Sequence, residues 1–169
     1  MAKLAEKPQK ADSRQLDDLE LAAWRGMLFA YRNMTAAIDE RLEREHALAL
    51  SSYEVLLLLS RAPDYSIRMG TLADELLLSR SGLTRLVDRL AARGYVERHT
   101  CPSDRRGTFA RLTEAGHDAF NAARPTNLAG IREQFVSRLD ADDLEDLARV
   151  WDKLDAGGDP SDDGSATCG

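Results

Sequence analysis

Eight arginines and no lysine lie between residues 79 and 111, and with three acids they give this segment a net charge of +5. They are Arg80, Arg85, Arg89, Arg93, Arg98, Arg105, Arg106 and Arg111. A guanidinium group can bind phosphate or a guanine edge through two parallel hydrogen bonds, which a lysine ammonium cannot do. The whole chain carries −6, mainly because residues 140–169 carry −8. A charge run is often only a solvated surface, so the elements that hold these arginines decide whether nucleic acid is the partner.

The first part of the basic segment predicts an amphipathic helix over about 79–93, closed by Gly94. The apolar face of this helix consists of Leu83, Leu86, Val87 and Leu90. The opposite face consists of Ser81, Thr84, Arg85, Asp88 and Arg89. Short hydroxyl side chains and Gly82 would let such a helix lie deep in a major groove, with the positive end of its dipole toward phosphate. The alternative is an ordinary surface helix that carries some arginines.

The elements around this helix predict a compact reading unit. A short helix from about Met69 to Leu76 precedes it across a tight turn, and Ile67 is expected to be a single extended residue. After it, 95–98 and 108–112 predict two strands around a polar turn at 102–107. The sequence therefore predicts two helices joined by a turn and followed by a basic β-hairpin.

The helices before this unit are expected at 14–46 and from Ser51 to just before Pro63. The first carries two neighbouring apolar series, made of Leu19, Ala23, Met27, Ala30, Met34 and Ala37 and of Leu21, Trp24, Leu28 and Tyr31. A helix that is apolar on several sides needs more cover than so small a chain supplies, so burial in a homodimer is expected. The second helix is expected to start at Ser51 because Ser51 and Glu54 have the spacing of a capping box.

Two further helices are expected after the hairpin. Thr113 should cap a helix that runs to about Ala123, and Pro125 should break or kink it. The helical stripe then continues to Asp140 through Leu128, Ile131, Phe135 and Leu139. Asp140 and Asp143 are expected to open the last helix. Its apolar positions, at three- and four-residue steps, are Leu144, Leu147, Ala148, Trp151 and Leu154.

The hairpin carries a specific motif, an Asp-x-Arg group followed by five residues and Leu-Thr-x-x-Gly. Its fixed positions are Asp104, Arg106, Leu112, Thr113 and Gly116. With Leu72-Ala73 and Asp88-Arg89-Leu90 before it, the motif resembles the MarR family of winged-helix transcriptional regulators, over about residues 16–155. The resemblance implies a mainly α fold with a small β-hairpin wing, in which a winged helix-turn-helix is flanked by N- and C-terminal dimerisation helices.

The same resemblance implies one MarR-like domain over residues 14–156. Its parts are dimerisation helices at 14–46 and 120–156 and a winged helix-turn-helix at 51–116. Residues 1–13 and 157–169 are too polar to bury a core, so we expect a flexible N-terminus and a disordered acidic tail. The longest aliphatic run, Val55 to Leu59, is too short for a signal peptide or a membrane span, so we expect a cytoplasmic protein without a membrane partner.

The function implied is a homodimeric repressor that binds a pseudo-palindromic double-stranded DNA operator and releases it when a small aromatic or anionic effector, or an oxidant, acts on the dimer. The expected DNA-binding set is Ser79, Arg80, Ser81, Thr84, Arg85, Arg89, Arg105 and Arg106. Asp104 is expected to orient Arg106 or a neighbouring arginine within the wing, the alternative being a simple turn residue. The expected dimerisation set is Leu19, Leu147, Trp151 and Leu154. An effector pocket is expected at Trp24, Arg25, Met27, Leu28 and Tyr31, for which core packing is the alternative.

Other functions are less well supported by the residues. The histidines His46, His99 and His117 are scattered, and no Gly-rich phosphate loop or Gly-x-Ser-x-Gly is present, so neither catalysis nor a cofactor is expected. His99 and Cys101 alone are too few for a metal site. Two alternatives remain open. One is a redox-sensing regulator acting through Cys101, and the other is a winged-helix protein-interaction module, which would lack the steep salt dependence of DNA binding.

Overall fold

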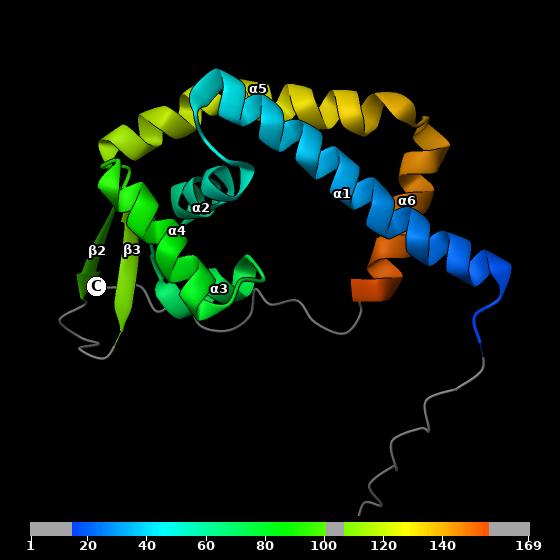
Figure 1. Cartoon of the computed structure of the whole chain (residues 1–169), viewed down its shortest axis with the longest axis horizontal. Helices are drawn as coiled ribbons and strands as arrows, with labels where there is room; N and C mark the ends of the chain where they lie inside the picture. The colour runs from blue at the N-terminus through cyan, green and yellow to red at the C-terminus, as the bar shows by residue number, and fades with distance from the viewer. Residues whose placement is uncertain (1–14, 101–106, 156–169) are drawn as a thin grey trace, which may run out of the picture. The chain divides into compact units, whose positions relative to one another are not determined.

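The computed structural model describes residues 15–100 and 107–155, which form six α-helices and three short β-strands (Figure 1). The helices are α1 (Asp18–His46), α2 (Leu50–Arg61), α3 (Met69–Glu75), α4 (Arg80–Ala92), α5 (Glu114–Gln134) and α6 (Ala141–Asp155). The strands are β1 (Ser66–Arg68), β2 (Val96–Thr100) and β3 (Thr108–Leu112). Two compact units meet within α1, the first ending at Asn33 and the second beginning at Met34. In the described residues no helix is long and apolar enough to cross a membrane.

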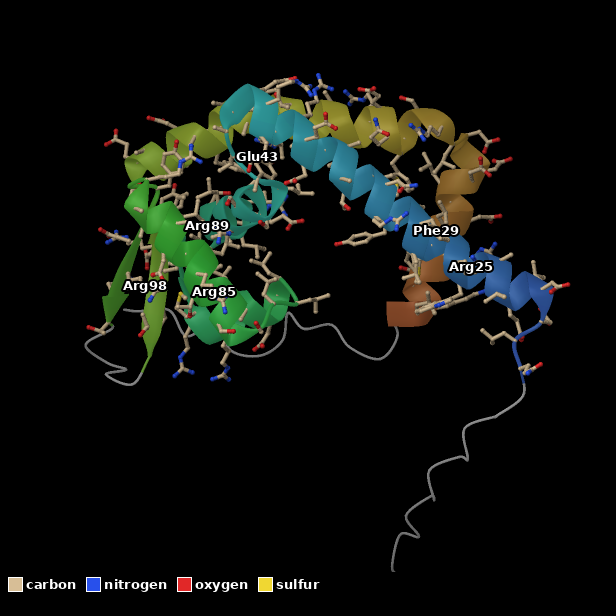
Figure 2. The ribbon with its side chains drawn as sticks, in the orientation of Figure 1. Arg25, Phe29, Glu43, Arg85, Arg89 and Arg98 are labelled. Carbon is tan, nitrogen blue, oxygen red and sulfur yellow. The ribbon has the colours of Figure 1, made fainter. Side chains whose placement is uncertain are left out.

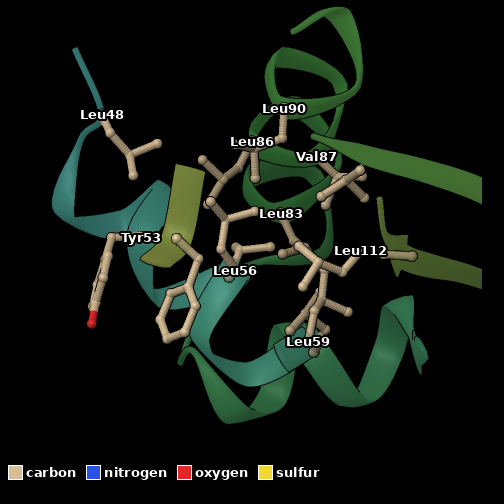
Figure 3. Close-up of a cluster of buried hydrophobic side chains, with 14 of the residues drawn as sticks. Leu48, Tyr53, Leu56, Leu59, Leu83, Leu86, Val87, Leu90 and Leu112 are labelled. Atoms are coloured by element: carbon tan, nitrogen blue, oxygen red, sulfur yellow. The ribbon is translucent and has the colours of Figure 1, made fainter. Parts of the chain in front are cut away.

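The core of the second unit lies between α2, α4 and the sheet (Figure 3). The four apolar residues predicted for one face of α4 are all buried, which confirms both the helix and its orientation. They pack with α2 and β3 residues that include Val55, Leu56, Leu59 and Leu112. Burial of each such side chain stabilises the fold by about 1.5–3 kcal/mol, so this face holds α4 firmly against the rest of the unit.

The three strands form one antiparallel sheet in the order β1-β3-β2. The predicted hairpin is confirmed, with Val96 opposite Leu112 and Thr100 opposite Thr108. The sequence predicted only one extended residue here, Ile67, but the structure has a three-residue strand. Ser66 to Arg68 pair with Arg111 to Phe109 along the other edge of β3. A strand this short gives no alternating pattern in the sequence, and only the neighbouring edge of β3 makes it a strand.

The helix boundaries bear out some capping predictions. Gly94 closes α4 with φ +73°, as predicted. Ser79, at which the helix was expected to start, lies just before α4 and accepts a hydrogen bond from the Gly82 amide at 3.1 Å. Asp140 and Asp143 cap α6 reciprocally, the amide of each donating to the carboxylate of the other at 3.2 and 2.8 Å.

The predicted capping box of α2 is wrong. Ser51 lies inside the helix, which begins at Leu50, and the preceding Ala49 has no side-chain cap. The Leu50 amide instead donates to Asp39 Oδ1 at 2.7 Å, so the cap comes from α1, eleven residues upstream. A carboxylate at that point also favours the positive end of the α2 dipole.

Pro125 does not break its helix, so the predicted helix end at about Ala123 is wrong. α5 runs without interruption from Glu114 to Gln134 and is followed by the 3₁₀ turn Val136–Arg138 and by α6. Proline removes one helical hydrogen bond, whereas the buried face of α5 is anchored on both sides of it by Phe120, Ala123, Asn127 and Gly130. Tertiary packing therefore outweighs the local cost of the proline.

Candidate nucleic-acid interface

The outward face of α4 is the candidate DNA-reading surface. Its buried leucines hold one side of the helix in the core, and this leaves Ser81, Thr84, Arg85, Asp88 and Arg89 exposed on the other. Ser79 and Arg80, at the start of the helix, are exposed as well. Figure 2 shows Arg85 and Arg89 along α4, with Arg98 on the neighbouring strand. The structure thus brings together six of the eight residues predicted to bind DNA.

The hydroxyl groups of Ser81 and Thr84 on this face already have local partners. Thr84 Oγ1 donates to the Arg80 carbonyl at 2.8 Å, and the hydroxyls of Ser79 and Ser81 are 3.3 Å apart. Both groups are exposed, so water or a DNA phosphate can replace these local bonds at small cost. Short side chains here leave the arginines as the groups that reach farthest from the helix.

The basic segment divides into arginines that face outward and arginines that hold the fold together. Arg80, Arg85 and Arg89 are exposed, and none forms an ion pair with another residue in the described part of the chain. Bidentate phosphate or guanine contacts need such uncommitted guanidinium groups. These three are therefore the described side chains best suited to bind DNA.

Three other arginines of the segment make intramolecular contacts. Arg93 donates to the Ala47 carbonyl and lies 4.6 Å from the Tyr95 ring centre. Arg98 pairs with Asp88 at 2.9 Å. Arg111 lies 3.9 Å from a carboxylate oxygen of Glu97. Charge counting treats all eight arginines alike, and only the structure separates these roles.

An open groove of about 290 Å³ lies between the hairpin, the start of α3 and the start of α4. It is lined by Arg68, Met69, Gly70, Arg80, Thr84, Arg98, Gly107 and Thr108. Of its arginines, Arg80 forms no ion pair with another described residue, so its guanidinium group is suited to an anion of phosphate size. Sequence reasoning missed Arg68, although a basic residue just before the first helix of a helix-turn-helix was a signal that could have found it.

Several predicted residues lie outside the described ranges. These are Asp104, Arg105 and Arg106 of the wing and Cys101 of the redox alternative, and their roles stay predictions. Within the described part of β2, His99 is engaged: its Nε2 lies 2.9 Å from Ser66 Oγ and its ring stacks on buried Phe109 with centres 5.5 Å apart. His99 thereby joins the two outer strands of the sheet across β3.

The predicted dimerisation residues lie in α1 and α6. Leu19, Trp151 and Leu154 are exposed by 78%, 44% and 69%, while Leu147 is half-buried. Trp151 and Leu154 are three residues apart on α6, and large apolar side chains grouped and exposed in this way are typical of a surface that another chain covers. This exposure agrees with the predicted role in dimerisation and does not test it.

The predicted effector residues lie on α1 within the first unit. Trp24, Arg25, Leu28 and Tyr31 are exposed, and Met27 is half-buried. The core-packing alternative therefore does not apply to the single chain. Sequence reasoning missed Phe29, which has Arg25 6.0 Å and Arg32 5.1 Å from its ring centre (Figure 2). The available signal in the sequence was the spacing of four residues from Arg25 to Phe29 and three from Phe29 to Arg32, which places the three side chains together on a helix.

Comparison with known proteins identifies the group to which this chain is related. The model of the MarR family matches residues 48–107. The chain is 30% identical over 116 residues to the HTH-type transcriptional regulator MhqR of Bacillus subtilis, a match that covers 69% of this chain and 77% of that protein. It is also 30% identical over 99 residues to the transcriptional repressor MprA of Escherichia coli, covering 57% of this chain and 56% of that one.

A solved structure supports the same relationship along nearly the whole chain. Sco3205, a MarR family transcriptional regulator from Streptomyces coelicolor solved in complex with DNA, matches with a TM-score of 0.82 and 30% identity. The match covers 90% of this chain and 95% of that one. This chain belongs to the MarR family of transcriptional regulators.

Proposed function

We propose that this protein is a transcriptional repressor that binds a pseudo-palindromic DNA operator as a homodimer in the cytoplasm and releases it when a small effector binds. The observation that carries the proposal is the outward face of α4. It presents Arg85 and Arg89 on a rigid helix whose opposite side is buried, next to short hydroxyl side chains. This combination suits insertion into a major groove. A repressor function also agrees with the similarity to MprA, a transcriptional repressor.

In the proposed complex, Arg85 and Arg89 bind base edges or flanking phosphates of the major groove. Arg80 lies at the rim of the groove between α4 and the hairpin and receives a backbone phosphate there. Arg105 and Arg106 are proposed to reach the neighbouring minor groove from the wing, where arginine responds to groove width and negative potential. Phosphate contacts would set the register, and base contacts would set the sequence preference.

A homodimer is proposed because one chain leaves too much apolar surface uncovered. Leu19 on α1 and Leu154 on α6 are each exposed by more than two thirds of their surface. A two-fold axis would place one α4 of each protomer about one helical turn of DNA apart, some 34–36 Å, and this would account for a pseudo-palindromic operator.

The effector is proposed to be a small aromatic acid that binds at Trp24, Arg25 and Tyr31. Exposed aromatic rings next to a guanidinium group can take an aromatic ring and a carboxylate together. An effector that favours a misaligned dimer by about 3 kcal/mol would lower operator affinity roughly a hundredfold. In a thermal-shift screen of aromatic acids with the purified protein, an inducing ligand should raise Tm, and Trp24→Ala should abolish that shift while operator affinity without effector stays nearly unchanged.

Selection from a random duplex library, followed by salt titration of the selected and scrambled duplexes, tests DNA binding itself. We expect affinity to fall steeply with salt for both duplexes. Arg85→Ala should weaken binding to the selected duplex by about 1–3 kcal/mol. The matched control is Arg44→Ala, which removes an exposed arginine of α1 that contacts Glu45 and not the proposed surface.

The outcomes separate the proposal from its alternatives. Equal binding of Arg85→Ala and Arg44→Ala to the selected duplex would remove α4 as the reading helix. Binding of no duplex at any salt concentration would favour the protein-interaction module. Loss of operator binding on mild oxidation, prevented by Cys101→Ser, would favour the redox-sensing regulator.

A further inference from the structure

Asp88 is an acidic side chain on the most basic surface of the protein. It lies on the outward face of α4, one helical turn from Arg85 and beside Arg89, and its side chain is 58% exposed. Close to DNA phosphates, an uncompensated carboxylate at this position would be repelled. The role of Asp88 therefore depends on the single described residue with which it forms an ion pair.

That partner is Arg98, on the middle of strand β2. Arg98 Nη2 lies 2.9 Å from Asp88 Oδ1 and also donates to the Thr84 carbonyl at 3.0 Å. Thr84 and Asp88 are one turn apart on α4, so one guanidinium group contacts two successive turns of the helix. The Arg98 side chain is two-thirds buried, at 34% exposure, and this limits the positions that it can adopt.

These contacts couple the two elements that would read DNA. The partner strand β3 contributes Ala110 and Leu112 to the buried core, and β2 also contributes Val96, at the start of the strand. Arg98 is two residues farther along, toward the hairpin turn, on the same side of the strand. Core packing and the pairing of β3 with β1 attach the hairpin to the unit, and Arg98 adds a direct polar link from the middle of β2 to two turns of α4, which fixes the angle between them.

We propose that Asp88 and Arg98 are positioning residues, which hold the hairpin at a fixed angle to α4 so that both elements meet an operator in register. This inference rests on the proposed function of the α4 face. It assigns Arg98 to the protein's internal geometry rather than to the set of arginines that bind phosphate. It also explains why a carboxylate is present on this surface.

The proposal makes a prediction whose sign is opposite to that of simple electrostatics. Removal of an acid from a DNA-binding surface by itself raises affinity for every duplex. If Asp88 is a positioning residue, Asp88→Ala instead lowers affinity for the selected operator by about three- to tenfold, since an exposed pair of this kind is worth a modest amount. Affinity for a scrambled duplex stays equal or rises, because unspecific binding does not need the two elements in register.

The matched control is Glu97→Ala, which removes an exposed acid from β2, the strand that carries Arg98. Glu97 is 57% exposed and contacts Arg111, not α4. We expect this variant to raise affinity for both duplexes by the same factor. Arg98→Met should reproduce the operator loss of Asp88→Ala, and the double variant should bind the operator no more weakly than the weaker single variant, because both changes break one interaction.

The measurements use the whole chain, and each outcome decides whether Asp88 is a positioning residue. A parallel rise in both affinities for Asp88→Ala and Glu97→Ala would overturn the proposal, since Asp88 would then be a bystander. Additive losses in Asp88→Ala and Arg98→Met would overturn it too and would make Arg98 a phosphate contact. Circular dichroism and the unfolding midpoint of each variant check that the fold is intact. If the wild-type protein binds no duplex, the proposed function fails, and this result is distinct from either of the others.

Discussion

Gly116 lies directly against the backbone carbonyl of Tyr95. A Cβ atom at position 116 would be 2.0 Å from the Tyr95 oxygen, and the Thr113 amide donates to the same oxygen at 3.1 Å. Thr113 also caps α5 by accepting from the Gly116 amide at 3.0 Å, and its hydroxyl donates to the Gly94 carbonyl at 2.6 Å. The Thr-x-x-Gly pattern of the sequence motif therefore joins the start of α5 to the segment between α4 and β2.

Gly116→Ala is expected to destabilise the protein by about 1–3 kcal/mol, because the obstacle is backbone and cannot move aside like a flexible side chain. Urea unfolding monitored by circular dichroism measures the change. Gly70→Ala is the control, since a Cβ there meets nothing within 4 Å and should leave stability equal or slightly higher. Equal stability of the two variants would contradict the close contact at Gly116.

Leu77, in the turn between α3 and α4, combines a left-handed backbone with almost complete exposure. Its φ is +52° and 94% of its surface is exposed. A β-carbon in this conformation is strained, and the side chain buries little surface in return. Leu77→Gly is therefore expected to raise stability by about 1 kcal/mol.

Leu77→Ala provides the control, because it removes the exposed side chain but keeps the β-carbon. Thermal unfolding of both variants should show a higher Tm for Leu77→Gly only. If Leu77→Ala gained as much, the benefit would come from removing an exposed leucine and not from relieving the backbone.

Glu45 and Thr126 link the end of α1 to α5. Thr126 Oγ1 donates to Glu45 Oε2 at 3.0 Å, and this hydrogen bond, supported by Arg41 and Arg44, holds the pKa of the Glu45 carboxyl below its usual value of 4.5. The folded pKa is thus lower than that of the unfolded chain. The resulting stabilisation is present above the unfolded pKa and is lost as pH falls through the folded pKa.

Thr126→Val should accordingly raise the pKa of Glu45 toward its ordinary value and lower stability at neutral pH. The part of the loss that comes from the carboxylate should vanish in acid. NMR titration of the Glu45 carboxyl carbon measures the pKa directly. Thr126→Ser retains the hydroxyl and should keep the low pKa, and an unchanged pKa in Thr126→Val would show that the arginines alone are responsible.

Trp151 and Leu154 on α6 test the proposed homodimer. The double variant Trp151→Ala with Leu154→Glu removes a large aromatic side chain and places a charge in the proposed interface. It should weaken self-association by at least about tenfold, or about 1.4 kcal/mol. Sedimentation velocity over a micromolar concentration series measures it.

The control for this prediction is Leu77→Glu, which places the same charge on a more exposed leucine outside α6. It should sediment as the wild-type protein does. A wild-type protein that stays monomeric and folded at these concentrations would contradict the dimer itself.

Local patterns in the sequence were enough to predict α4. Four leucine and valine positions at helical steps define the buried face of α4, and Ser79 and Gly94 mark its ends as predicted. The hairpin strands and the caps at Thr113 and Asp140 are also determined by residues only a few positions apart. Periodicity and capping depend on neighbours along the chain, and a sequence displays those neighbours directly.

Only the tertiary structure decided which arginines are available to DNA and which elements support them. Arg98 is committed to α4, and Arg93 to Ala47, because folding brings together residues that are 10 and 46 positions apart. Long-range contacts also let Asp39 cap α2 and let β1 pair with β3. The buried face of α5 keeps that helix continuous at Pro125. Residue types alone state what a side chain can bind, but its partner is set by long-range packing, which no local pattern records.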